Sequence, residues 1–130
     1  MEQTISNAIS EFLNLMAQAQ KDFVWSQEEV HRQDQLTQDY LHMLELGDCS
    51  YHKKARIAEA MGECRAERRA HKDNVAILTP LITFLESEKG KMTLSQLQQT
   101  LGAVRKAERA IQDRRYVPRV LSQEEYDRTP

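Results

Sequence analysis

The stretch from Gln3 to Leu46 contains neither glycine nor proline, and its apolar residues recur every three or four positions. The stripe comprises Ile5, Ile9, Phe12, Met16, Ala19, Phe23, Val30, Tyr40 and Leu44. Such spacing places these side chains on one face of a helix that lies along a partner helix. We therefore predict a helix over residues 4–46, with Thr4 or Ser6 as its N-cap and with Gly47 ending it in the left-handed conformation.

A second stripe with the same spacing follows residues 47–50. It comprises Ile57, Met61, Cys64, Arg68, His71, Val75, Leu78, Ile82 and Leu85. The stripe predicts a helix over residues 50–88 that Asp48 or Ser50 caps. Pro80 lies inside the pattern and removes one backbone hydrogen bond, so we expect a kink or a break between Ala76 and Thr79.

A turn at residues 88–91, which contain Gly90, and a third helix over residues 94–115 are predicted next. Thr93-x-x-Gln96 matches a capping box at the start of this helix. Its inward residues are Leu94, Leu97, Leu101, Val104, Ala107 and Ile111. Tyr116-Val117-Pro118 is expected to stop the helix and to leave residues 116–130 as an extended tail, in which Ser122-x-x-Glu125 begins one short turn.

The first two helices can pair in a hairpin because both stripes are apolar at their ends and polar in the middle. If the chain folds back at residue 48 or 49, facing residues have numbers that add up to about 97. Ser26 then lies near His71, and Glu29 near Arg68. We predict an all-α fold with a single helical domain over residues 1–115: a long antiparallel hairpin resembling a coiled coil, with a polar layer of Glu29, Arg68 and His71, and a third helix packed as in a bundle.

Charge is distributed unevenly along a chain whose net charge is only −2. Residues 1–50 carry nine acidic and two basic side chains, whereas residues 51–130 carry eleven acidic and sixteen basic ones. Two interpretations stay open. The halves neutralise each other across the hairpin, where acidic residues near Glu28 and Asp34 face the run from Arg65 to Lys72, or they bind an external partner.

Arginines dominate a basic strip on the third helix and the tail. The strip comprises Arg105, Lys106, Arg109, Arg114, Arg115 and Arg119, with Tyr116 among them. Guanidinium groups suit bidentate contact with phosphate or carboxylate, so this strip is a candidate partner-binding surface. An acidic protein partner is favoured over a nucleic acid, because the sequence pI is about 6.1 and no known nucleic-acid-binding motif is present. The other interpretation is a solvated helix face that also pairs within the chain.

Residues 75–85 are apolar on nearly every side. A helix of this kind must be covered on more than one face, by the third helix, by the start of the first helix, or by a second copy of the chain. Trp25, next to Phe23 and Val24, is a candidate anchor for such a contact, and a core position is the alternative. We therefore expect a homodimer.

Metal and catalytic motifs are incomplete. One Glu28-x-x-His31 motif is present, whereas di-iron bundles need two such motifs and two further glutamates. Cys49-x-x-His52, with His42 and Cys64 elsewhere, lacks the tight ligand pairs of a structural zinc site. No catalytic triad and no glycine-rich phosphate loop is visible, so we predict no metal, no cofactor and no enzymatic activity.

Two cysteines, no apolar run of about 20 residues and no signal peptide predict a cytoplasmic protein that does not cross a membrane.

Four segments form a recognisable pattern: Tyr51-His52-Lys53-Lys54-Ala55-Arg56 through Arg65-Ala66-Glu67-Arg68-Arg69, Leu78-Thr79-Pro80-Leu81, Leu101-Gly102-x-Val104-Arg105-Lys106, and Arg115-Tyr116-x-Pro118-Arg119. Through these segments, residues 40–120 resemble small uncharacterised helical proteins encoded by phages and mobile elements of Gram-positive bacteria. The resemblance implies a role inside an infected bacterial cell. Small phage proteins of this kind often bind stoichiometrically, for example as inhibitors of host defence nucleases such as CRISPR effectors.

The function expected from sequence is therefore that of a non-enzymatic protein-binding module whose partner is a host enzyme or complex. Two binding faces stay open: the acidic first helix, which would imitate nucleic-acid phosphate, and the arginines of the second and third helices, which would bind an acidic surface. A nucleic-acid-binding accessory protein that uses the basic third helix and tail is the alternative.

Overall fold

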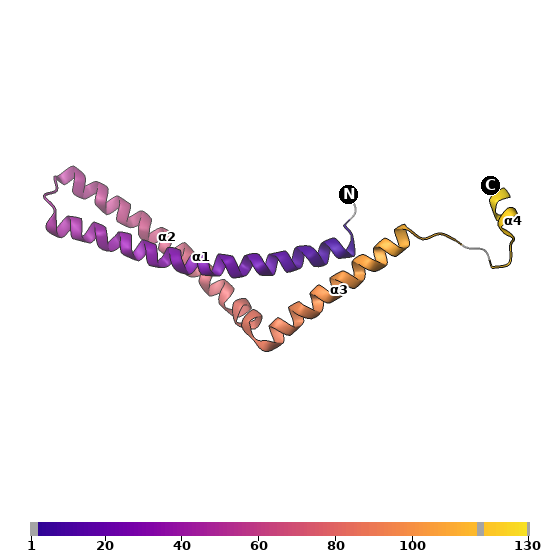
Figure 1. Ribbon diagram of the computed structural model, residues 1–130. Helices are drawn as coiled ribbons and strands as arrows, with labels where there is room; N and C mark the ends of the chain where they lie inside the picture. The colour runs from indigo at the N-terminus through magenta and orange to yellow at the C-terminus, as the bar shows by residue number, and fades with distance from the viewer. Residues whose placement is uncertain (1–2, 117–118, 130) are drawn as a thin grey trace.

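The computed structural model describes residues 3–116 and 119–129, and all the regular elements in these ranges are α-helices. Helices α1 (Ile5–Leu46) and α2 (Tyr51–Glu86) form a long antiparallel hairpin (Figure 1). From the end of α2 the chain turns sharply into α3 (Glu88–Gln112), which runs back toward the start of α1. The all-α class and the hairpin with a third helix are confirmed.

The tail is not extended throughout, because it contains a short helix, α4 (Gln123–Arg128). The Ser122 hydroxyl accepts a hydrogen bond from the backbone N–H of Glu125, which is the cap predicted for this turn. Figure 1 shows α4 apart from the other three helices. Val117 and Pro118, to which the sequence analysis assigned the end of α3, lie outside the described residues.

Side-chain hydroxyls cap both helices of the hairpin. Thr4 accepts from the backbone N–H of Asn7 at 3.1 Å, and Ser50 accepts from that of Lys53 at 3.3 Å. The left-handed conformation predicted for Gly47 is wrong, because its φ is −85° and its ψ is 151°. A Cβ at Gly47 would lie 2.6 Å from the Met43 carbonyl oxygen, so the glycine permits a close approach rather than a positive φ.

A single residue, Ser87, forms the corner between α2 and α3. Its N–H donates to the Phe84 carbonyl at 3.1 Å, while its hydroxyl accepts from the N–H of Gly90 at 3.0 Å. The turn predicted at residues 88–91 is therefore the first turn of α3, which begins at Glu88 instead of residue 94 and ends at Gln112 instead of residue 115. A serine that ends one helix and caps the next leaves no residues for a loop.

Of the kink or break predicted near Pro80, the break is absent, because α2 is continuous through this residue. Pro80 is exposed, which leaves water free to reach the carbonyl of Ala76 that proline cannot bond. Just before it, the Thr79 hydroxyl donates to the Val75 carbonyl at 2.6 Å.

The inner stripe predicted for α2 is confirmed, since each of its nine residues is buried or half-buried. On α1 the stripe is correct from Met16 onward, but Ile5 and Phe12 are exposed, and Ser6 and Leu13 take the inner positions. On α3, Ala107 and Ile111 are likewise exposed. The core lies where the three helices meet and contains Met16, Ile82 and Leu85, with Phe23, Leu78, Leu81 and Leu94 packed against them.

We predict that Gly90→Ala lowers the free energy of unfolding by about 2 kcal/mol or more, because the added methyl collides with backbone. A Cβ at Gly90 would lie 1.9 Å from the Phe84 carbonyl oxygen and 3.0 Å from the Leu85 Cα. Urea unfolding followed by circular dichroism measures the change.

Gly62→Ala is the matched control, because a Cβ at this helical position meets nothing within 4 Å. It is expected to raise the free energy of unfolding by about 0.5–1 kcal/mol through helix propensity. Equal effects of the two substitutions would contradict the corner described above.

Candidate protein-interaction surfaces

A polar layer lies in the middle of the hairpin, as predicted, but with a different pairing. Asp34 Oδ1 accepts from Arg68 Nε at 2.6 Å and lies 3.5 Å from Arg65 Nη1. Glu29, which was predicted to face Arg68, pairs instead with Arg32 on its own helix at 3.5 Å. The predicted Glu29–Arg68 contact is therefore wrong, while the half-buried Arg68 remains a bridge between the helices.

Ser26 supplies the second cross-hairpin contact. It is fully buried, and its hydroxyl accepts from Asn74 Nδ2 at 2.7 Å. In these polar pairs, Asp34–Arg68, Asp34–Arg65 and Ser26–Asn74, the two residue numbers add up to slightly more than the sum of about 97 predicted from the position of the loop. The reason is that side chains lean toward the N-terminus of their own helix, so in an antiparallel pair their tips meet when each residue lies slightly C-terminal of the contact.

Neutralisation across the hairpin is limited to one acidic residue. Among the described residues, the ion pairs that join α1 to α2 both involve Asp34. Exposed Glu28, Asp39 and Glu45 stay unpaired in this part of the chain. Most of the negative charge of α1 is therefore available to a partner.

Trp25 is not a core residue, but it contacts the second helix of the hairpin. Its ring makes a T-shaped contact with that of His71 of α2, with centroids 4.9 Å apart and planes at 86°. His71 is half-buried and its Nε2 lies 3.6 Å from Glu67 Oε2. Trp25 therefore contacts α2 through its ring while 54 % of the residue stays exposed to solvent.

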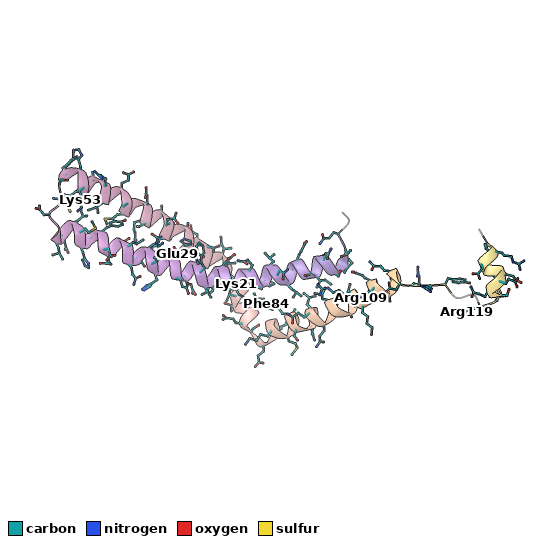
Figure 2. The ribbon with its side chains drawn as sticks, turned by 45° about the horizontal axis from the view of Figure 1, so that its top comes forward. Lys21, Glu29, Lys53, Phe84, Arg109 and Arg119 are labelled. Carbon is teal, nitrogen blue, oxygen red and sulfur yellow. The ribbon has the colours of Figure 1, made fainter. Side chains whose placement is uncertain are left out.

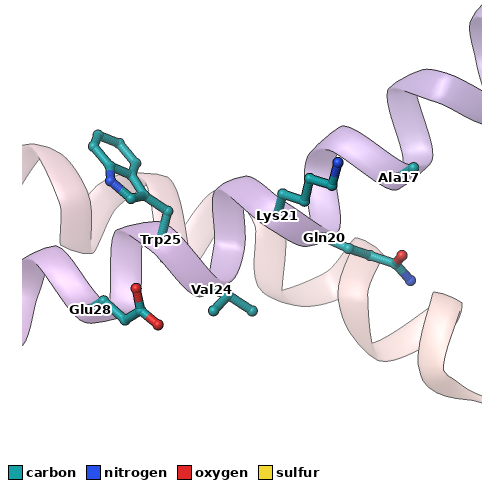
Figure 3. A pocket seen from close by; sticks show the side chains of 6 residues that line it. All are labelled: Ala17, Gln20, Lys21, Val24, Trp25 and Glu28. Atoms are coloured by element: carbon teal, nitrogen blue, oxygen red, sulfur yellow. The ribbon is translucent and has the colours of Figure 1, made fainter.

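A shallow hollow of about 500 Å³ surrounds this tryptophan, which we call the Trp25 groove. Figure 3 shows the indole along one edge of the groove and Val24 and Glu28 along the other. Its lining residues all belong to α1 and are Ala17, Gln20, Lys21, Val24, Trp25 and Glu28. The floor is mostly apolar, with one positive and one negative side chain beside it.

The basic strip is not a single surface. Arg105 lies four residues before Arg109 on α3 and Lys106 three residues before it, so both neighbour Arg109 on one side of the helix. Arg114 and Arg115 follow the end of α3, and Arg119 lies well away from Arg109 (Figure 2).

Within the described residues no acidic group pairs with Arg105, Lys106, Arg109, Arg114, Arg115 or Arg119. Glu108, on the same helix, bonds to Ser6 instead. Tyr116 is exposed beside these arginines. Their charge is therefore uncompensated.

The metal motifs considered from sequence do not converge. Cys49 Sγ donates to the Met43 carbonyl at 3.4 Å, and Cys64 is buried in the hairpin. Over the described ranges, no three histidine, cysteine or acidic side chains are grouped to hold a metal ion.

Comparisons with protein-family models, with curated proteins and with solved structures found no match. The function must therefore be argued from these surfaces. None of the helices described is both long and apolar enough to cross a lipid bilayer.

Two residues that shape the hairpin and its closure were not singled out from sequence. Asn74 precedes the striped position Val75, and Glu108 continues the spacing of Leu101 and Val104 on α3. The three-four spacing predicts that Glu108 faces inward, but it was not assigned to the inner face because its side chain is charged.

We predict that a double-mutant cycle between Asp34→Ala and Arg68→Ala gives a coupling free energy of about 0.5–1 kcal/mol, typical of a partly exposed ion pair. The cycle between Glu29→Ala and Arg68→Ala should give a coupling within about 0.3 kcal/mol of zero. Urea unfolding of the single and double variants measures both. A stronger coupling for Glu29 than for Asp34 would contradict the register.

Proposed function

We propose that this chain is a non-enzymatic binding module that acts by occupying the surface of a protein partner. The observation that carries the proposal is the Trp25 groove. A large aromatic side chain, half-exposed and held by a ring contact to a second helix, loses little conformational entropy when it is buried by a partner. Exposed Val24 adds apolar area beside it.

The form of the groove supports binding of a protein rather than of a small substrate. It is open and lined by one helix, whereas small-molecule sites are enclosed and draw polar groups from several elements. A groove along a helix matches another helix or an extended edge of a partner. Lys21 and Glu28 beside the apolar floor would set the orientation of that partner.

Charge suggests the class of partner. Helix α1 presents exposed acidic residues that α2 leaves unpaired, and a nucleic-acid-binding enzyme offers a basic surface that such a helix can cover. Together with the resemblance to phage and mobile-element proteins, this supports a stoichiometric inhibitor of a host defence nuclease, such as a CRISPR effector, in the bacterial cytoplasm. In this mechanism the acidic helix takes the place of nucleic-acid phosphates.

We expect the protein to inhibit such a nuclease with an end point of one chain per binding site. Trp25→Ala should weaken inhibition at least about 30-fold, the loss typical of a hot-spot aromatic residue. Titration of the protein into a plasmid-cleavage assay, across a panel of bacterial defence nucleases, measures both. Leu46→Ala, which removes another exposed apolar residue of α1, is the control and should inhibit as the unmodified chain does.

Loss of nuclease activity at far less than one chain per nuclease would indicate catalysis and contradict the proposal. Equal inhibition by Trp25→Ala and the unmodified chain would contradict the role of the groove.

The alternative, a nucleic-acid-binding accessory protein, rests on the uncompensated arginines of α3. It predicts a gel shift at low salt whose affinity falls steeply as salt rises and which Arg105→Glu combined with Arg109→Glu abolishes. Lys53→Glu with Lys54→Glu, at the far end of the hairpin, is the charge-matched control. No shift at low salt would remove this alternative.

A further inference from the structure

The chain exposes far more surface than a compact protein of its mass. Its accessible area is 10654 Å² for 15.1 kDa. A compact monomer of that mass is expected to expose about 7,100 Å². The difference, about 3,500 Å², exceeds the roughly 1,000–2,500 Å² that each chain buries in an obligate homodimer. Part of this excess comes from the extended arrangement, in which α4 lies apart from the other helices, and the three long helices also expose surface that a second chain could cover.

Part of that surface is an apolar strip on the first half of α1. Ile5, Ala8, Phe12 and Leu15 follow one another at intervals of three, four and three residues, which is the heptad spacing of a coiled-coil contact. Ile5 is 67 %, Phe12 47 % and Leu15 61 % exposed, and Ala8 is exposed as well. These four residues define the N-terminal strip.

Helix α3 leaves this strip open because it packs on a different side of α1. The Ser6 hydroxyl donates to Glu108 Oε2 at 2.8 Å, and the Ser6 N–H donates to Glu108 Oε1 at 3.1 Å. Inner positions next to α3 are accordingly Ser6, Leu13 and Met16. Ala8, Phe12 and Leu15 lie on the adjoining side of α1, which this contact leaves exposed, and Ile5 borders the hollow beside Glu108.

Apolar residues of α3 extend the strip into a two-helix face. Ile111 is 63 % exposed and lines the same hollow, of about 440 Å³, as Ile5. Ala107, one turn before Ile111, is exposed, and Val104 is half-buried. Gln3, Thr4, Glu108 and Gln112 also line that hollow, and exposed apolar side chains rimmed by polar ones are typical of contact sites.

We propose that a second copy of this chain covers the face, with the N-terminal strips of the two chains packed against each other about a two-fold axis. A two-fold contact requires a patch that matches itself, and a short apolar strip without charge at its inner positions does so. Helices α1 and α3 of both chains would then form a four-helix bundle, the arrangement in which helices with half-covered apolar faces complete their cores.

The mass in solution tests the proposal. Light scattering at micromolar concentration should give about twice 15.1 kDa for the unmodified chain. Phe12→Glu combined with Leu15→Glu should halve that mass, because two charges per chain would be buried without partners. Circular dichroism then checks that the variant is still helical. A milder pair, Phe12→Ala with Leu15→Ala, should raise the dimer dissociation constant at least tenfold without introducing charge.

Ile77→Glu is the matched control. Ile77 is 75 % exposed on α2 within the apolar segment around Pro80, the other surface from which a dimer was expected. The control should keep the doubled mass. A mass of 15 kDa for the unmodified chain would overturn the proposal, as would dissociation by Ile77→Glu but not by Phe12→Glu with Leu15→Glu. Trp25→Ala should leave the mass unchanged, so failure of the dimer and failure of the Trp25 groove are separable.

Discussion

Helix α1 is an unbroken helix of 42 residues, about 63 Å long at 1.5 Å per residue. An isolated helix cannot bury an apolar stripe, so α1 depends on partners along its whole length. Helix α2 cannot cover all of α1, because the two helices diverge beyond the core formed by Met16, Ile82 and Leu85. The chain solves this by covering α1 with α2 and then with α3, on either side of the corner at Ser87 (Figure 1).

The corner determines what remains exposed. At Gly90 the backbone of α3 passes so close to Phe84 that no side chain fits, and α3 therefore leaves α2 in a fixed direction. That direction brings Glu108 to Ser6 and leaves Ile5, Phe12 and Leu15 open. In the other half of α1, the contacts of Asp34 and Ser26 set the hairpin register and hold His71 against Trp25. The packing of α2 on α1 thus determines the Trp25 groove, and the packing of α3 on α1 determines the N-terminal strip.

Periodicity was enough to predict the helices and the inner stripe of α2, because burial against a single neighbour follows the three-four spacing. The periodicity gave wrong inner positions where the helix packed against α1 changes from α2 to α3. Ile5 and Phe12 continue the stripe that faces α2 farther along, but α3 approaches from another side and buries Ser6 and Leu13 instead. Periodicity cannot supply the direction of a helix that packs from elsewhere in the chain.

Surface features were predictable only in part. Trp25 was identified from its residue type and neighbours, and the predicted register placed His71 near the adjacent Ser26, but the T-shaped ring contact could not be predicted from the sequence. The basic strip was recognised from its residue types, but the directions of Arg114 and Arg115 depend on where α3 ends, at Gln112 rather than residue 115. Gly90 was interpreted as a turn because glycine marks turns, whereas here it marks a close approach of two helices.

Helix α3 packs against the first part of α1, which α2 does not cover. Hydrogen exchange at the Ser6 amide tests this claim most directly. An amide in the first turn of a helix has no acceptor within that helix, and here Glu108 of α3 supplies it from 102 residues away. We expect the Ser6 amide to exchange slowly in the unmodified chain. In Glu108→Ala it should exchange as fast as an amide without a hydrogen-bond acceptor in the first turn of a helix. Fast exchange at Ser6 in the unmodified chain would contradict this claim.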